Sequence, residues 1–149
     1  MSNLYPVCLD LRRKKCLVAG GGKVAERKIR ALLDCGAEVY VVSPQLTTEL
    51  AGMARTGEIV HIERNYTTTD LENAFLVISA TDDEKTNRRV AGDCLERNIL
   101  INVVDDPANC NFIVPAVFRQ GALSISVSTE GKSPMLARKI REDLTAVFG

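Results

Sequence analysis

The fold is decided by residues 16–28, Cys16-Leu-Val-Ala-Gly20-Gly-Gly-Lys-Val-Ala-Glu-Arg-Lys28, in which a short apolar run leads through three glycines into a helical stretch. Here Gly20, Gly22 and Ala25 form the pattern G-x-G-x-x-A, a weak signal alone and a strong one between a strand and a helix. Gly20 permits a tight turn, Gly22 lets a pyrophosphate approach the backbone, and Ala25 allows close helix packing. The stretch therefore predicts a dinucleotide-binding turn at a helix N-terminus. A plain glycine-rich turn is the alternative, although glycines are costly in backbone entropy.

The chain around this turn alternates between strand-like and helical segments as far as residue 112. Strands are expected at 16–19, 38–42, 59–63, 74–80 and 100–104, and helices at 24–35, 47–55, near Asp70 and at 84–97. Such alternation predicts an α/β fold of the Rossmann type, a parallel sheet with helices on both faces. In the first helix we expect one apolar face, made of Val24, Ala31, Leu32 and Cys35.

The pattern changes after Pro107. Residues 116–119 and 123–128 flank Gln120-Gly121 and predict an antiparallel hairpin. Ser133-Pro134 then opens a last helix, with Ser133 as its cap. That helix has an apolar face, and no later segment of this chain can cover it. Either the face packs on another subunit, or the chain is cut short at its C-terminus. The face comprises Leu136, Ile140, Leu144 and Val147.

Composition narrows the classes of function. With 149 residues and 46% apolar side chains, the chain can bury one core. Nineteen basic residues balance nineteen acidic ones, so no overall charge attracts nucleic acid or an anionic membrane. Apolar runs are too short for a signal peptide or a spanning helix, and we expect a soluble cytoplasmic protein. The cysteines are widely spaced and odd in number, which predicts reduced, mostly buried thiols rather than disulfides or a metal site. They are Cys8, Cys16, Cys35, Cys94 and Cys110.

The end of the second predicted strand reads Val42-Ser43-Pro44-Gln45. An Asp or Glu usually binds the ribose hydroxyls there, and an Arg nearby accommodates a 2′-phosphate. Neither is present, so this position does not distinguish NAD from NADP. Ser43 and Gln45 hydrogen-bond the ribose in one interpretation, and Ser43 only caps the following turn in the other. The sole histidine, His61, lies on a predicted edge strand, and we expect it to face solvent without a role.

Two polar clusters follow the fourth and fifth predicted strands, Ser79-Ala-Thr-Asp-Asp83 and Asn102-Val-Val-Asp-Asp-Pro107. Both belong to the carboxyl edge of the sheet, where open α/β folds bind ligands. Thr81 is placed to line a cofactor, or else to cap the next helix together with its aspartates. Asp105 comes directly off an apolar strand, where a carboxylate must be held by donors or face a ligand. An ordinary turn aspartate is the alternative.

Four stretches together resemble one family, precorrin-2 dehydrogenase/sirohydrochlorin ferrochelatase, which is also the N-terminal module of siroheme synthase. The resemblance covers essentially the whole chain. It implies oxidation of precorrin-2 to sirohydrochlorin with NAD⁺ and, in bifunctional members, insertion of Fe²⁺ into sirohydrochlorin. The stretches are Val18-Ala-Gly-Gly-Gly-Lys-Val-Ala-Glu-Arg-Lys28, Ser79-Ala-Thr-Asp-Asp83, Asn102-Val-Val-Asp-Asp-Pro107 with Asn111-Phe-Ile-Val-Pro115, and Ser126-Val-Ser-Thr-Glu-Gly-Lys-Ser-Pro-Met-Leu-Ala-Arg138.

The resemblance also assigns roles to residues. It implies that Asp105 serves proton transfer, and that Thr129 stands where some members carry a phosphorylated serine. It implies a homodimer formed through residues 113–149, beside a NAD-binding domain over residues 1–112. Family members usually continue into a helical segment that helps to form the substrate cleft, whereas this chain stops at Gly149. The glycine pattern and the family resemblance together predict which residues bind the cofactor. They are Gly20, Gly22, Lys23, Val24, Ser43, Pro44, Gln45 and Thr81.

A non-catalytic NAD-sensing regulatory module is the competing function. Such modules share the glycine turn, but they usually keep the acidic residue after the second strand and do not need the stretch Asn102-Val-Val-Asp105. Both features favour an enzyme. No His, Cys or carboxylate set has metal-ligand spacing, so the sequence does not decide whether a chelatase activity is present.

Overall fold

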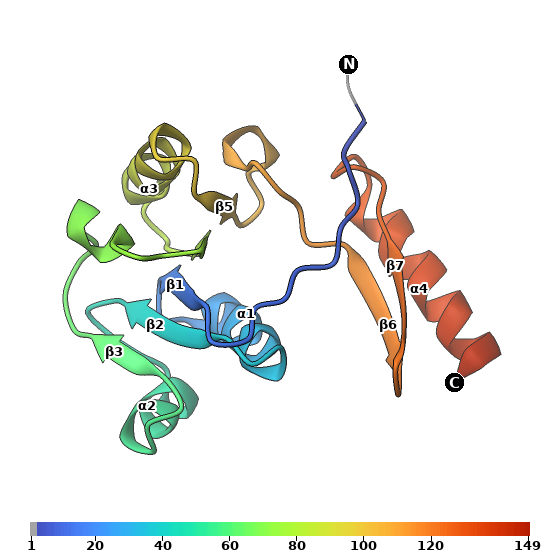
Figure 1. The fold of residues 1–149 in the computed structure, drawn as a ribbon, viewed down its shortest axis with the longest axis horizontal. Helices are drawn as coiled ribbons and strands as arrows, with labels where there is room; N and C mark the ends of the chain where they lie inside the picture. Colours follow the sequence, from blue (N-terminus) through green and yellow to red (C-terminus); the bar gives the residue numbers. More distant parts are fainter. Residues whose placement is uncertain (1–2) are drawn as a thin grey trace. The chain divides into compact units, whose positions relative to one another are not determined.

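The computed structural model describes residues 3–149 and divides the chain into two units. The first unit comprises Cys8–Phe112, and the second comprises Ile113–Gly149 together with residues 3–7. Residues 3–7 therefore group with the second unit rather than with the first. Figure 1 labels the elements of both units.

The first unit is built on one parallel sheet of five strands in the order β3-β2-β1-β4-β5. The strands are β1 (Lys15–Ala19), β2 (Glu38–Val42), β3 (Val60–Ile62), β4 (Leu76–Ser79) and β5 (Leu100–Val103). In the central strand, Val18 lies between Val41 of β2 and Ile78 of β4. The strand order reverses at β1, so its carboxyl end is the switch point at which open α/β sheets bind ligands.

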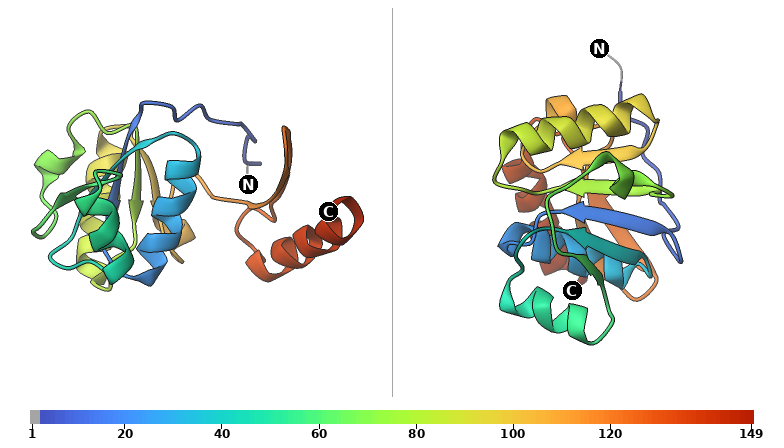
Figure 2. Two further views of the ribbon diagram at one scale, coloured as in Figure 1. Left: turned by 90° about the horizontal axis from the view of Figure 1, so that it is seen from below. Right: turned by 90° about the vertical axis from the view of Figure 1, so that its left-hand side faces the viewer.

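Helices cover both faces of this sheet, which confirms the Rossmann-type fold. The helices are α1 (Lys23–Asp34), α2 (Thr48–Arg55) and α3 (Glu84–Glu96), with short 3₁₀ turns η1 (Thr68–Leu71) and η2 (Pro107–Asn109). Cys16 and Val18 of β1 pack in one core with residues of α1 and α2. The alternate residues Leu17 and Ala19 pack in a second core with α3. Figure 2 (left) shows α1 and α2 in front of the strands and α3 behind them.

The first helix buries a different stripe from the expected one. Ala25, Ile29 and Leu32 are buried, whereas Val24 is 36% exposed and Ala31 is also exposed. The prediction was therefore right at Leu32 and wrong at Val24 and Ala31. The stripe begins one residue later because Val24, in the first turn, lies at the rim of the sheet rather than over it.

The second unit contains a hairpin and a helix. The hairpin pairs β6 (Ala116–Gln120) with β7 (Leu123–Val127), and α4 runs over Pro134–Phe148. Because Gln120 pairs with Leu123, the turn residues are Gly121 and Ala122, one position later than expected. Gly121 has a φ of +57°, as the first turn residue of a type II′ hairpin requires.

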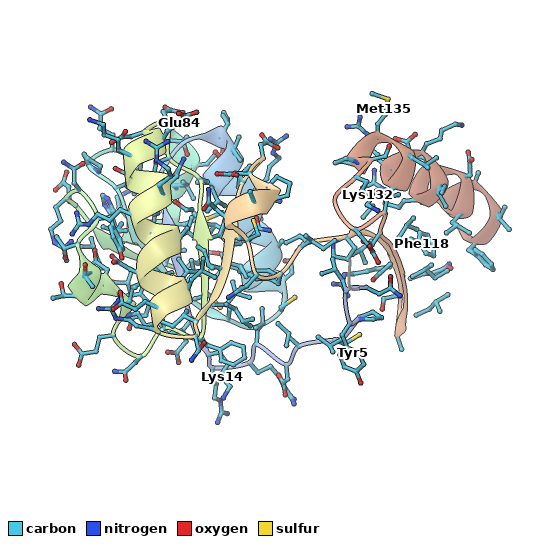
Figure 3. All side chains as sticks on the ribbon, turned by 90° about the horizontal axis from the view of Figure 1, so that it is seen from above. Tyr5, Lys14, Glu84, Phe118, Lys132 and Met135 are labelled. Carbon is cyan, nitrogen blue, oxygen red and sulfur yellow. The ribbon has the colours of Figure 1, made fainter. Side chains whose placement is uncertain are left out.

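Helix α4 begins as the sequence predicts, with Ser133 accepting a hydrogen bond from the N–H of Leu136 at 3.2 Å. The hydroxyl of Thr129 accepts from the N–H of Ser133 at 2.8 Å, so Thr129 is part of the approach to this helix. Much of the helix's apolar surface is exposed, and Figure 3 shows Met135 projecting from its first turn. The exposed apolar residues of α4 are Met135, Leu136, Ile140, Val147 and Phe148. Between residues 3 and 149, no helix is long and apolar enough to cross a membrane.

Candidate functional site

A cleft of about 1020 Å³ lies at the carboxyl edge of the parallel sheet. Its walls are the loops that follow β1, β2, β3, β4 and β5, with part of α3. All of the residues singled out from the sequence line this cleft, namely Gly20, Gly22, Lys23, Val24, Ser43, Pro44, Gln45, Thr81 and Asp105. The cleft also takes in residues that the sequence did not single out, among them Asn65, Tyr66, Asn87 and Arg89.

The three glycines of the turn serve different purposes. Gly20 has a φ of +119°, and a Cβ there would lie 2.5 Å from the carbonyl oxygen of Ala80. A Cβ on Gly21 would lie 2.1 Å from the carbonyl oxygen of Gln45. Packing therefore requires both of these glycines, and the role of Gly21 was not predicted from the sequence. By contrast, a Cβ on Gly22 would meet nothing within 4 Å, so its backbone borders open space.

That open space lies at the N-terminus of α1. Gly22 is the N-cap residue and makes no side-chain capping bond. The first intrahelical hydrogen bond runs from the N–H of Glu26 to the carbonyl of Gly22 at 3.0 Å, which leaves the N–H groups of Lys23 and Val24 available. Free donors, a positive helix end and room at Gly22 together fit the pyrophosphate of a dinucleotide.

The loop after β2 is held by its own hydrogen bonds. Ser43 is 8% exposed, and its hydroxyl donates to the carbonyl of Gln45 at 2.6 Å. The structure therefore favours the turn-capping interpretation of Ser43. Nε2 of His61 lies 2.8 Å from the carbonyl oxygen of Ser43, which requires the proton on Nε2. His61 is half-buried rather than solvent-facing as expected, because β3 lies beside the end of β2.

Glu26, which was not among the site residues predicted from the sequence, connects this loop to the glycine turn. It is 8% exposed and accepts a hydrogen bond from the hydroxyl of Thr47 at 2.9 Å. That bond, with the charges of Lys23 and Arg30, lowers the pKa of the Glu26 carboxyl against the opposing effect of burial. The N–H of Thr47 donates to the carbonyl of Gly21 at 3.0 Å. The glycine turn and the loop after β2 are therefore joined by hydrogen bonds and form one continuous wall of the cleft.

The loop after β4 is organised by Asn87 of α3. Its Oδ1 accepts from the hydroxyls of Ser79 and Thr81, each at 2.7 Å, and its Nδ2 donates to the carbonyl of Thr81 at 3.0 Å. The cap of α3 is Asp83, whose carboxylate accepts from the N–H of Lys85 at 3.1 Å. Thr81 thus lines the cleft, while its hydroxyl is hydrogen-bonded to Asn87 and to the carbonyl of Asp83.

Tyr66 and Arg89 border the cleft on the side of β2 and β3. Tyr66 is 5% exposed and donates its hydroxyl proton to Asp93 at 2.8 Å. Burial and the Asp93 carboxylate raise the pKa of Tyr66. The guanidinium of Arg89 lies 5.3 Å from the centre of the tyrosine ring, a cation–π contact. Within residues 3–149, Arg89 makes no ion pair, so the cleft holds a cationic group without a protein counter-ion.

The two adjacent aspartates after β5 have different surroundings. Asp105 is exposed at the cleft with a φ of +61°, in a turn closed by the hydrogen bond from the N–H of Asp106 to the carbonyl of Val103 at 3.1 Å. Its carboxylate makes no hydrogen bond to any residue between 3 and 149. Asp106 instead accepts a hydrogen bond from Nδ2 of Asn109 at 2.7 Å and does not line the cleft.

The cysteines are free thiols and lie apart from this chemistry. Cys16 and Cys94 are buried and Cys35 and Cys110 are half-buried, whereas Cys8 is exposed, so the expectation of mostly buried thiols was wrong at Cys8. Burial raises the pKa of Cys16 to about 11 and that of Cys94 to about 12, so both thiols stay protonated near neutral pH. Across the described part of the chain, no three His, Cys, Asp or Glu side chains are grouped so that they could hold a metal ion.

Comparisons with known proteins match both units. A family model described as putative NAD(P)-binding covers residues 7–116, and one described as sirohaem biosynthesis protein central covers residues 120–146. The chain is 43% identical to a siroheme synthase of Chromobacterium violaceum, over 97% of this chain and 31% of that protein. It is 45% identical to a siroheme synthase of Thioalkalivibrio sulfidiphilus, over 93% of this chain and 28% of that protein. The chain thus spans about a third of the length of these relatives.

Solved structures match as well. SirC, a precorrin-2 dehydrogenase, superposes with a TM-score of 0.87 at 33% identity, over 98% of this chain and 72% of that one. The pyruvate reductase of Chlamydomonas reinhardtii superposes with a TM-score of 0.51 at 16% identity, over 66% of this chain and 28% of that one. The second match concerns the fold alone.

Proposed function

Because the chain belongs to the precorrin-2 dehydrogenase family, we propose that it oxidises precorrin-2 to sirohydrochlorin with NAD⁺ as its cofactor in siroheme biosynthesis. The observation that carries the proposal is the likeness to SirC, which extends over both units of the chain. The alternative of a non-catalytic NAD-sensing module finds no support in the comparisons. A cytoplasmic location is part of the same proposal.

In this proposal the glycine turn holds the pyrophosphate. The N–H groups of Lys23 and Val24 donate to its oxygens, while Gly22 leaves the space that they need. Ser43-Pro44-Gln45 borders the adenosine, because this loop follows β2 on one side of β1. Thr81 borders the other side of the dinucleotide. When bound, NAD⁺ supplies the acceptor for the hydride that leaves precorrin-2.

Asp105 is the proposed proton acceptor. Oxidation of precorrin-2 removes a proton as well as a hydride, so a base or water must take that proton. The carboxylate of Asp105 is exposed at the cleft, on the side of β1 opposite the proposed adenosine loop. It has no hydrogen-bond donor among residues 3–149 that would prevent it from serving as a base.

The second unit has a role in assembly in this proposal. The exposed apolar residues of α4 support a homodimer in which the second unit, including Ile113–Gly149, meets its counterpart and helps to bind the tetrapyrrole. Insertion of Fe²⁺ into sirohydrochlorin, which the family resemblance also implies, stays a prediction, with Fe²⁺ as a substrate.

The function can be tested with the purified chain, precorrin-2 and NAD⁺. We expect the absorbance of sirohydrochlorin to appear only when both compounds are present. Absence of product from a folded chain that binds NAD⁺ would contradict a complete catalytic site in these 149 residues. Absence of NAD⁺ binding would contradict the cofactor assignment itself.

A further inference from the structure

Asn87 is the most highly bonded side chain of the cleft. It makes four hydrogen bonds, to the hydroxyl of Ser79 and to the hydroxyl, N–H and carbonyl of Thr81. The N–H of Thr81 can only donate, at 3.3 Å, and its carbonyl can only accept, at 3.0 Å. These two partners therefore fix which end of the Asn87 amide is oxygen and which is nitrogen. No other uncharged side chain of this size offers both an acceptor and a donor in one plane.

The hydrogen bonds from Asn87 to the backbone of Thr81 take the place of the strand-to-strand hydrogen bonds, which end with β4. Ala80 still donates its N–H to the carbonyl of Ala19, at 2.8 Å. One residue later, both backbone groups of Thr81 bond to the Asn87 side chain instead. Asn87 therefore holds the two peptides on either side of Thr81, the Ala80–Thr81 peptide through its N–H and the Thr81–Asp82 peptide through its carbonyl.

The Ala80–Thr81 peptide touches the glycine turn. A Cβ on Gly20 would lie 2.5 Å from the carbonyl oxygen of Ala80 and 3.2 Å from the nitrogen of Thr81. The turn is thus packed directly against the peptide that Asn87 holds. A shift of that peptide would be passed to Gly20 and so to the first turn of α1, where the proposed pyrophosphate donors lie.

We propose that Asn87 is a positioning residue for the cofactor, which holds the Ala80–Thr81 peptide against Gly20 and so aligns the N-terminus of α1. The role rests on the proposed function, since it assumes that the dinucleotide binds at this turn. Asn87 acts through Thr81 and Gly20, so its loss should change cofactor affinity more than the chemical step.

The test compares three single variants with the parent by calorimetric NAD⁺ binding and by thermal unfolding. Asn87→Ala removes all four bonds, and we expect NAD⁺ affinity to fall about tenfold or more. Ser79→Ala removes the buried Ser79–Asn87 bond and leaves both Thr81 backbone contacts. It should therefore lower the unfolding temperature, while NAD⁺ affinity stays within about twofold of the parent value. The control is Arg88→Ala, at the residue that follows Asn87 in α3. Arg88 is exposed and pairs with Glu84 at 3.8 Å, so its loss should leave NAD⁺ affinity and the unfolding temperature unchanged.

Asn87→Leu keeps the approximate size of the side chain, loses all four bonds and adds no charge to the cleft, and it serves if the alanine variant does not fold. It should raise the KM for NAD⁺ about tenfold or more, with kcat at saturating NAD⁺ within about twofold of the parent. A folded Asn87 variant that binds NAD⁺ within about twofold of the parent would overturn the proposal, as would an equal loss in Ser79→Ala. If the parent itself bound no NAD⁺, the proposed function would fail instead.

Discussion

Replacing Asp105 by asparagine removes a negative charge from the cleft and leaves the turn that carries it intact. Asparagine adopts the left-handed backbone at least as readily as aspartate, so the φ of +61° is preserved. The side chain is exposed and makes no hydrogen bond within residues 3–149. The free energy of unfolding should therefore change by less than about 0.5 kcal/mol.

The expected effect on catalysis is large. A general base contributes about 10²–10⁴-fold to a rate. At about 1.36 kcal/mol for each factor of ten, the loss of Asp105 should raise the activation free energy by about 2.7–5.4 kcal/mol. NAD⁺ affinity should stay near the parent value, because the proposed pyrophosphate donors follow β1 and Asp105 follows β5.

Initial rates of sirohydrochlorin formation at saturating NAD⁺ measure the effect, and Asp106→Asn is the matched control. Asp106 bonds to Asn109 at 2.7 Å outside the cleft, and asparagine can keep the accepting oxygen. This control should stay within about twofold of the parent. If Asp105→Asn did the same, Asp105 would be only a turn residue. A parallel fall of turnover and NAD⁺ affinity would mean that Asp105 shapes the cofactor pocket.

Gly22→Asp should abolish NAD⁺ binding measured by calorimetry, yet leave stability within about 0.5 kcal/mol of the parent, since its Cβ meets nothing within 4 Å. Gly21→Ala should lower the free energy of unfolding in urea by about 1–3 kcal/mol, because its Cβ would lie 2.1 Å from a backbone oxygen, and an unchanged midpoint would contradict this. Although burial raises the pKa of Asp70, its hydrogen bond with Arg64 lowers it below the ordinary 3.8. This pair should therefore stabilise the fold above that pH, and the stability difference between parent and Arg64→Gln should disappear as the pH falls through and below 3.8. Ile140→Glu should convert a dimeric parent into a monomer in sedimentation at micromolar concentration, and a monomeric parent would contradict the proposed interface.

Local patterns made the glycine turn predictable. Strand, turn and helix follow one another within residues 15–34, so the spacing of Gly20, Gly22 and Ala25 already contained the geometry. The carboxyl-edge positions of Thr81 and Asp105 followed from the alternation of strands and helices, because parallel strands end at one edge.

Contacts between segments that lie far apart in the sequence could not be predicted from local sequence patterns. His61 reaches Ser43, 18 residues away, only because β3 pairs with β2. Arg89 meets Tyr66 because α3 packs on the same face of the sheet as the segment after β3. Gly21 is needed for a contact with the β2 loop, which no turn pattern specifies.

The most direct test is an experimental structure of this chain with NAD⁺ bound. The account predicts pyrophosphate oxygens about 3 Å from the backbone nitrogens of Lys23 and Val24. It also predicts the adenosine beside Ser43-Pro44-Gln45 and the nicotinamide on the side of Asp105. A dinucleotide bound in the reverse direction, or outside the carboxyl-edge cleft, would contradict it.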